Sequence, residues 1–262
     1  MIGRFRPNKY FWISAASVGA TVLVWHLCTD VFEIKPPDIF PGPREVFDTF
    51  VTKLHSRRPD GATLIGHLGS SLYVTMVGYL LGAVVGVPLG IAMAWSKYVD
   101  RIVKPLFDLL RPVPGIAWIP LFILLFGIGT FSKALVIFIG AMVACVVNSY
   151  TGIRQTKEVH LWVGDIFGAT SRQKLFKIAI PTAIPMIFTG LRVALGSSWA
   201  ALVAAELLAS NVGLGYMIQL SRGLGRTDII IVGMISIGIV GAVLDKILHI
   251  IEVRVAKGMN AE

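Results

Sequence analysis

Residues 70–95 read SSLYVTMVGYLLGAVVGVPLGIAMAW and contain no charged side chain. An α-helix rises about 1.5 Å per residue, so a helix over this stretch could cross the roughly 30 Å hydrocarbon core of a membrane. Gly78, Gly82, Gly86 and Gly90 recur at four-residue spacing and share one helix face. Glycines on one face let a second helix approach closely. We expect that helix to belong to the same chain; a partner subunit or a moving gate is the alternative.

The rest of the chain repeats this apolar character. The 262 residues are 55% hydrophobic and only 15% charged, with a mean hydropathy of +0.75. Soluble domains carry about 25% charged residues, so a soluble enzyme, a disordered protein and a repeat solenoid are excluded. The sequence predicts a single all-α membrane domain, residues 1–262, with about six transmembrane helices. The five other apolar stretches lie near 11–29, 112–127, 132–152, 183–208 and 229–250.

Two of these stretches raise specific questions. The stretch at 112–127 is short and follows Arg111-Pro-Val-Pro-Gly, so a tilted or partly re-entrant helix is an alternative to a full span. The first stretch follows Arg4, Arg6 and Lys9, as in a signal peptide, but no small-residue cleavage site comes after it. We therefore expect an uncleaved first helix.

Charge predicts the orientation of the helices. If the N-terminus is cytoplasmic, most Lys and Arg residues outside the spans also face the cytoplasm, as membrane proteins prefer. Both termini are then inside. The net charge of +9 fits anionic lipid headgroups better than nucleic acid in such a protein.

Several catalytic and metal-binding motifs are missing from the sequence. No Gly-Lys dipeptide occurs, so the chain lacks a GxxxxGK[ST] phosphate loop. There is no HExxH, the five histidines are scattered, and Cys28 and Cys145 sit in or beside apolar runs. The sequence predicts no enzymatic activity, no metal site and no disulfide on this chain.

One charged residue falls deep inside an apolar stretch. Arg192 lies about nine residues into the stretch at 183–208, and an arginine at such depth faces protein or water rather than lipid. At 100° per residue it shares a stripe with Gly196, Trp199, Val203 and Glu206. The stripe could line a pathway in which Arg192, Trp199 and Glu206 meet a small anion. Alternatively, Arg192 reaches the cytoplasmic headgroups and Glu206 the outer interface.

The longest predicted cytoplasmic segment, residues 153–182, is basic and amphipathic. We expect a short helix that ends at Gly168 and a second that starts with Ser171 as its N-cap. The first helix would expose Leu161, Trp162, Asp165 and Ile166, and an exposed apolar patch rimmed by charge usually marks a contact site. An interfacial helix on the inner leaflet is the alternative.

That segment resembles the cytoplasmic signature of permease subunits of ATP-binding-cassette (ABC) importers, E-A-A-x3-G-x9-I-x-L-P. Gly168, Ile178 and Pro181 match it, whereas Trp162, Val163 and Gly164 replace E-A-A. Residues 100–129 also resemble the branch that imports taurine, alkanesulfonates, nitrate and bicarbonate. So do the stretches TGLR at 189–192, LVAAEL at 202–207 and GLGYMIQ at 213–219.

The resemblance implies a type I importer permease in the bacterial inner membrane. Two copies would form the pathway, two cytoplasmic ATPase subunits would bind ATP and Mg²⁺, and an external binding protein would deliver a small anion, with taurine or another sulfonate favoured. The residues that would couple the permease to the ATPases are Trp162, Val163, Gly164, Asp165, Gly168, Ala169, Ile178 and Pro181.

Two other functions compete with this interpretation. A stand-alone secondary transporter or channel usually carries intramembrane carboxylates, broken helices or repeats. Here Glu206 and Asp245 lie near the ends of their stretches, and no repeat is visible. A scaffold that transports nothing would not need Arg192 and its stripe.

Overall fold

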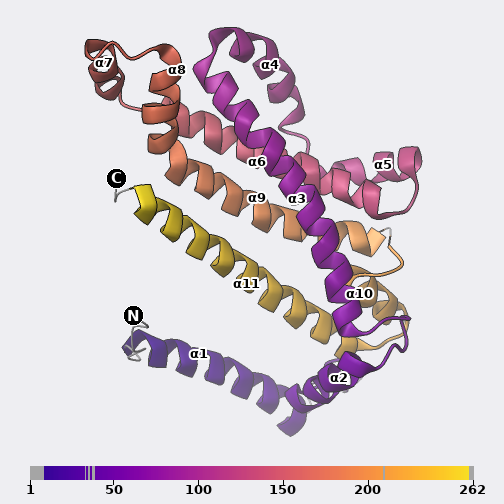
Figure 1. Cartoon of the computed structure of the whole chain (residues 1–262). Helices are drawn as coiled ribbons and strands as arrows, with labels where there is room; N and C mark the ends of the chain where they lie inside the picture. The colour runs from indigo at the N-terminus through magenta and orange to yellow at the C-terminus, as the bar shows by residue number, and fades with distance from the viewer. Residues whose placement is uncertain (1–8, 33, 35, 37–38, 209, 260–262) are drawn as a thin grey trace. The chain divides into compact units, whose positions relative to one another are not determined.

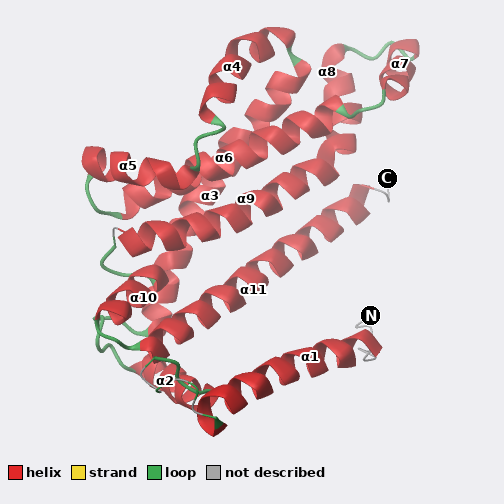
Figure 2. Ribbon diagram, turned by 180° about the vertical axis from the view of Figure 1, so that it is seen from behind, coloured by secondary structure: helices red, strands yellow, loops and turns green. Residues whose placement is uncertain are grey.

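The computed structural model describes residues 9–32, 34, 36, 39–208 and 210–259. Within these residues all regular structure is helical (Figure 2). The helices are α1 Lys9–His26, α2 Pro43–His55, α3 Leu64–Trp95, α4 Lys97–Leu110, α5 Ile119–Phe126, α6 Thr130–Arg154, α7 Glu158–Ile166, α8 Ser171–Lys174, α9 Ile180–Leu208, α10 Leu214–Gly223 and α11 Thr227–Met259.

Five helical segments are long and apolar enough to cross a membrane. They are Trp12–Val31, Leu64–Trp95, Thr130–Arg154, Ser171–Leu208 and Thr227–Val255. A sixth crossing exists if α4 and the segment Gly115–Phe126, which meet at an 81° bend, count as one broken span. The prediction of an all-α protein with about six apolar spans is confirmed.

The predicted span at 112–127 is not one continuous helix. Its only α-helix, α5, has eight residues and follows a 3-10 turn at Gly115–Trp118. Pro112 and Pro114 lack an N–H and restrict the residues before them, so the chain leaves α4 and changes direction there.

The chain divides into two compact units. Unit 1 comprises Met1–Ile65 and Met217–Ile235, and unit 2 comprises Gly66–Tyr216 and Ser236–Glu262. In unit 2, α6 and α9 run side by side (Figures 1 and 2). In unit 1, the Trp25 indole donates a hydrogen bond to the Pro41 carbonyl, which ties the end of α1 to the segment before α2.

The four evenly spaced glycines of α3 lie against α6. A Cβ on Gly82 would come within 2.6 Å of the Ala141 Cβ, and one on Gly90 within 2.5 Å of the Val146 carbonyl oxygen. Gly78 and Gly86 meet α6 in the same way. Real Cβ atoms do not approach so closely, so these two backbones can touch only where α3 has no side chains.

Candidate functional site

The predicted coupling segment forms two short helices at one end of unit 2 (Figure 1). The first, α7, exposes a continuous apolar face because its apolar residues recur at helical spacing. The exposed fractions are 57% for Val159, 58% for Trp162, 46% for Val163, 82% for Ile166 and 83% for Phe167. Roughly half or more of each of these side chains is therefore open to solvent.

The turn after α7 depends on a glycine. Gly168 has a φ of +70°, a left-handed conformation that favours glycine, and the following Ala169 N–H donates to the Gly164 carbonyl at 2.8 Å. The second helix, α8, is capped by Thr170, whose hydroxyl accepts from the Gln173 N–H while the Gln173 side chain accepts from the Thr170 N–H. The prediction of Ser171 as the N-cap is wrong by one residue.

Two contacts fix α7 to the helical segment that follows it. The Lys174 ammonium lies 2.5 Å from an Asp165 carboxylate oxygen. Gly164 packs so closely that an added Cβ would lie 3.0 Å from the Ile178 Cδ1 and 3.2 Å from the Lys174 Cγ. Asp165 is therefore an anchoring residue, and it supplies a polar tie in a segment that lacks the E-A-A signature. Ile178 lies in a π-helical turn, Leu175–Ala179, and Pro181 follows in the first turn of α9.

The three predicted pathway residues do not converge on one site. Arg192 pairs with Glu252 and lies 3.6 Å from Asp245, both on α11. Trp199 is 7% exposed, and its indole donates to the Ile237 carbonyl at 3.0 Å. Glu206 is 1% exposed near the other end of α9. Arg192 keeps the most solvent access of the three, with 38% of its side chain exposed.

Glu206 belongs to a buried network whose other members lie on α3 and at the start of α10. The Ser71 hydroxyl lies 2.8 and 2.9 Å from the two Glu206 carboxylate oxygens, and the Gly215 N–H donates to one of them at 2.9 Å. Ser71 also accepts from the Leu214 N–H, and His67 accepts from the Gly213 N–H. Two first-turn N–H groups of α10 thus find side-chain acceptors.

A signal for part of this network was present in the sequence. His67, Ser71 and Thr75 recur at four-residue spacing at the start of an apolar stretch, and all three are fully buried in the structure. A polar stripe on an apolar helix indicates buried hydrogen bonds. Its partners lie some 135 residues further along the chain, and no periodicity within α3 identifies them.

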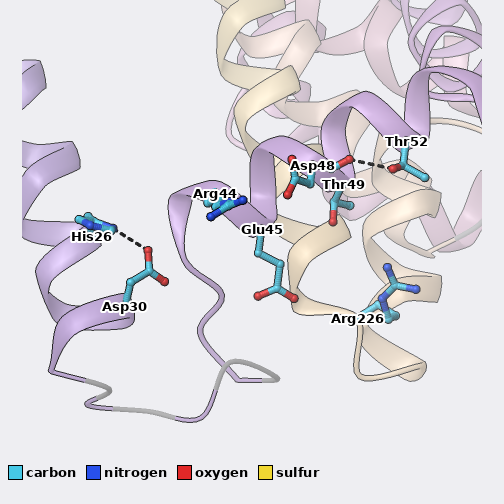
Figure 3. A pocket seen from close by; sticks show the side chains of 8 residues that line it. All are labelled: His26, Asp30, Arg44, Glu45, Asp48, Thr49, Thr52 and Arg226. Carbon is cyan, nitrogen blue, oxygen red and sulfur yellow. Dashed lines mark hydrogen bonds and ion pairs between the residues drawn. The ribbon is translucent and has the colours of Figure 1, made fainter.

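Unit 1 holds a polar pocket of about 590 Å³ (Figure 3). Figure 3 shows Arg44 and Glu45 extending from α2, with Arg226 from the segment before α11. The pocket is lined by His26, Asp30, Arg44, Glu45, Asp48, Thr49, Thr52 and Arg226. The predicted orientation puts this pocket on the outer side of the membrane.

Only some of the charged side chains in this pocket form ion pairs. Arg226 donates two hydrogen bonds to Asp228, at 2.9 and 2.7 Å. These bonds raise the pKa of Arg226 above its ordinary value, and the nearby Glu45 carboxylate acts in the same direction, so the guanidinium stays charged. Arg44, in contrast, forms no ion pair with any residue of the described segments.

These arrangements suit mechanical and recognition roles. In the described ranges no three His, Cys, Asp or Glu side chains gather as metal ligands. What the chain does present is an apolar face outside the long apolar helices, held at a fixed angle by Gly168 and the Asp165–Lys174 pair. An exposed apolar face of this kind is typical of a contact site for another molecule.

Comparisons with known proteins agree with this geometry. The family of binding-protein-dependent transport system inner membrane components matches residues 86–260. The taurine transport system permease protein TauC of Escherichia coli is 32% identical, over 96% of this chain and 91% of that protein. The putative aliphatic sulfonates transport permease protein SsuC of Bacillus subtilis is also 32% identical, over 97% and 90%.

The fold has a solved counterpart. An inward-facing structure of the MetNI methionine ABC transporter superposes with a TM-score of 0.63 and 17% identity, over 75% of this chain and 95% of that one. The type I importer architecture, the branch that contains taurine, sulfonate and nitrate permeases, and the location in the bacterial inner membrane are therefore established. The chain belongs to the binding-protein-dependent transport system inner membrane components, and it is the permease subunit of an ABC importer rather than an enzyme.

Proposed function

We propose that two copies of this permease form the import pathway for taurine or a related small sulfonate. Two cytoplasmic ATPase subunits, which bind ATP and Mg²⁺, each receive one α7, and an external binding protein delivers the cargo. The observation that carries the proposal is the apolar face of α7, formed by Val159, Trp162, Val163, Ile166 and Phe167.

The α7 face is suited to a groove in another protein. Large exposed aromatic and aliphatic side chains on a short helix are typical anchors for a hydrophobic groove. The Asp165–Lys174 pair and the close packing at Gly164 connect α7 to the start of α9. A displacement of α7 would therefore move the cytoplasmic end of a membrane helix, which is the mechanical requirement for coupling.

Two further observations support the homodimer and the cargo. Symmetric pairs are by far the commonest oligomers, and a twofold assembly supplies two α7 faces for two ATPase subunits. The similarity to TauC and SsuC, whose names specify taurine and aliphatic sulfonates, supports a small sulfonate as the cargo, with nitrate as the competing candidate.

Reconstitution tests the proposal. The permease, its ATPase and its binding protein would be assembled in proteoliposomes, and ATP-driven uptake of labelled taurine would be measured with competing alkanesulfonate, nitrate or bicarbonate. Ile166→Asp should lower stimulated ATP hydrolysis and uptake at least about tenfold, because a charge in the centre of a desolvated interface costs several kcal/mol. Native mass spectrometry of the same assembly should count two permease copies.

His160→Asp is the matched control. It adds the same charge to the same helix but lies outside the apolar face, and it should leave uptake within about twofold. Equal losses in both variants would show that an added charge harms α7 wherever it is placed, and the argument for docking through the apolar face would fail. Uptake of nitrate or bicarbonate in preference to taurine would disprove the cargo while leaving the coupling role in place.

A further inference from the structure

A second, smaller cavity lies in unit 2 between α3, α4 and α6. Its volume is about 210 Å³, and its polar lining comprises Lys104 and Asp108 from α4, Arg111 directly after α4, and Tyr150 and Thr151 from α6. The remaining lining is apolar. Pockets that enclose a whole drug-sized ligand measure roughly 300–1,000 Å³, so this one has room only for a small polar group.

The two cations of the cavity have no carboxylate partner in the described ranges. Lys53, Lys174, Arg192 and Arg226 are each ion-paired, but Lys104 and Arg111 are not. The Lys104 ammonium instead lies 5.2 Å from the centre of the Tyr150 ring. With Asp108 the side chains of the cavity carry a net charge of +1, which favours a singly charged anion.

The helix that carries these cations has three distinct faces. Val99, Val103 and Phe107 pack against α3 and α6. A second face is apolar but exposed, with Tyr98 at 80%, Ile102 at 71%, Leu106 at 62% and Leu109 at 75%. The third face carries the charges, since Lys104, Asp108 and Arg111 recur at i, i+4 and i+7.

A helix with one apolar and one charged outward face is typical of the membrane boundary, where acyl chains cover the first face and headgroups meet the second. The charge distribution of the chain puts the start of α4 on the cytoplasmic side. Basic pockets between membrane helices on that side suit anionic lipid headgroups.

We propose that this cavity binds the headgroup of an anionic phospholipid. Lys104 and Arg111 pair with the phosphate, and Asp108 accepts a hydrogen bond from a headgroup hydroxyl of the phosphatidylglycerol type. The acyl chains lie along Tyr98, Ile102 and Leu106. This site is separate from the α7 face and holds whether or not the proposed cargo is correct.

Native mass spectrometry of the full-length permease in detergent tests the site. The protein would be titrated with dioleoylphosphatidylglycerol and with dioleoylphosphatidylcholine. We expect the wild type to prefer phosphatidylglycerol. The double variant Lys104→Gln/Arg111→Gln should weaken that binding about thirtyfold, because each basic residue near a membrane surface contributes about fivefold to the affinity.

The double variant Lys97→Gln/Arg101→Gln is the control. It removes the same charge from the same helix, but neither residue lines the cavity. Equal weakening in both double variants, or equal binding of the two lipids by the wild type, would overturn the proposal. Lipid binding would then not depend on the cavity. Displacement of the lipid by millimolar inorganic phosphate would also overturn it, because the site would then bind a free anion.

A folding defect is separated from a binding defect by the single variants. Lys104→Gln and Arg111→Gln should each weaken phosphatidylglycerol binding about fivefold. Thermal unfolding in detergent should leave both singles close to the wild type. Wild-type lipid affinity in both singles would contradict the assignment of the cavity.

Discussion

Contacts with a second helix change the role that Arg192 can be assigned. Its stripe on α9 suggested an anion pathway, yet the structure supplies Glu252, Asp245 and the His249 ring, 2.9 Å away, as neighbours on α11. These two carboxylates more than offset the single positive charge of the guanidinium. Because 38% of the side chain remains exposed, an anion can still reach it, and the pathway role stays a prediction.

A variant that also removes the neighbouring carboxylates distinguishes a pathway role of Arg192 from a structural one. Arg192→Leu leaves Asp245 and Glu252 without their cation and should lower both the thermal midpoint and taurine uptake. Adding Asp245→Asn and Glu252→Gln removes the unbalanced charges, and the midpoint should recover. If Arg192 contacts the anion, uptake in proteoliposomes stays about tenfold lower. Recovery of uptake together with stability would confine Arg192 to a structural pairing role.

Contacts between residues that are distant in the sequence could not be predicted. Periodicity predicted that Arg192, Trp199 and Glu206 share a stripe, because that property belongs to one helix. It could not predict that Trp199 bonds the Ile237 carbonyl or that Ser71 meets Glu206. Partners distant in the chain are fixed by packing, which a single sequence does not contain.

At the scale of the helices, the α3–α6 contact depends on the glycine face. An added methyl at Gly82 would lie 2.6 Å from the Ala141 Cβ and 2.9 Å from two α6 backbone atoms. Backbone cannot rotate away as a flexible side chain can, so the two helices must separate. Packing density in membrane helix pairs is then lost along the contact.

Gly82→Ala should therefore lower the free energy of unfolding by roughly 1–3 kcal/mol, the usual cost of overpacking. Gly69→Ala, on the same helix with nothing within 4 Å of the added Cβ, is the control. It should be neutral or stabilising by up to about 1 kcal/mol, because alanine favours helix more than glycine does. Thermal unfolding in detergent measures both, and a Gly82→Ala protein as stable as the control would disprove the close contact.

Element boundaries were predictable where proline and glycine act locally. Pro112 and Pro114 indicated a break, and Gly168 indicated the end of α7, because each restricts its own backbone. The sequence did not predict the 81° bend or the capping by Thr170 in place of Ser171. The angle depends on packing, and either hydroxyl residue is a good N-cap.

On the scale of the whole molecule, the chain must meet partners on opposite sides of a membrane. The α7 face has no charged side chain of its own, so its proposed contact with the ATPase subunits is with a hydrophobic groove. The outer pocket of unit 1 is different, because charged and hydroxyl groups line it and Arg44 has no ion-pair partner in the described segments. Charged surfaces of this kind speed the association of two proteins more than they strengthen the final complex.

We therefore expect the outer pocket to contact the binding protein. Arg44→Glu should weaken the affinity of loaded binding protein for the reconstituted transporter roughly three- to tenfold, mainly through slower association, and the effect should shrink as salt rises because exposed charges are screened. Arg57→Glu, an exposed charge in the same outer loop but outside the pocket, is the matched comparison. The measurement is the association rate of the two variants, determined by surface plasmon resonance. Equal slowing in both variants would mean that the binding protein responds only to the overall charge of the outer surface. No slowing in either variant would place the docking site elsewhere.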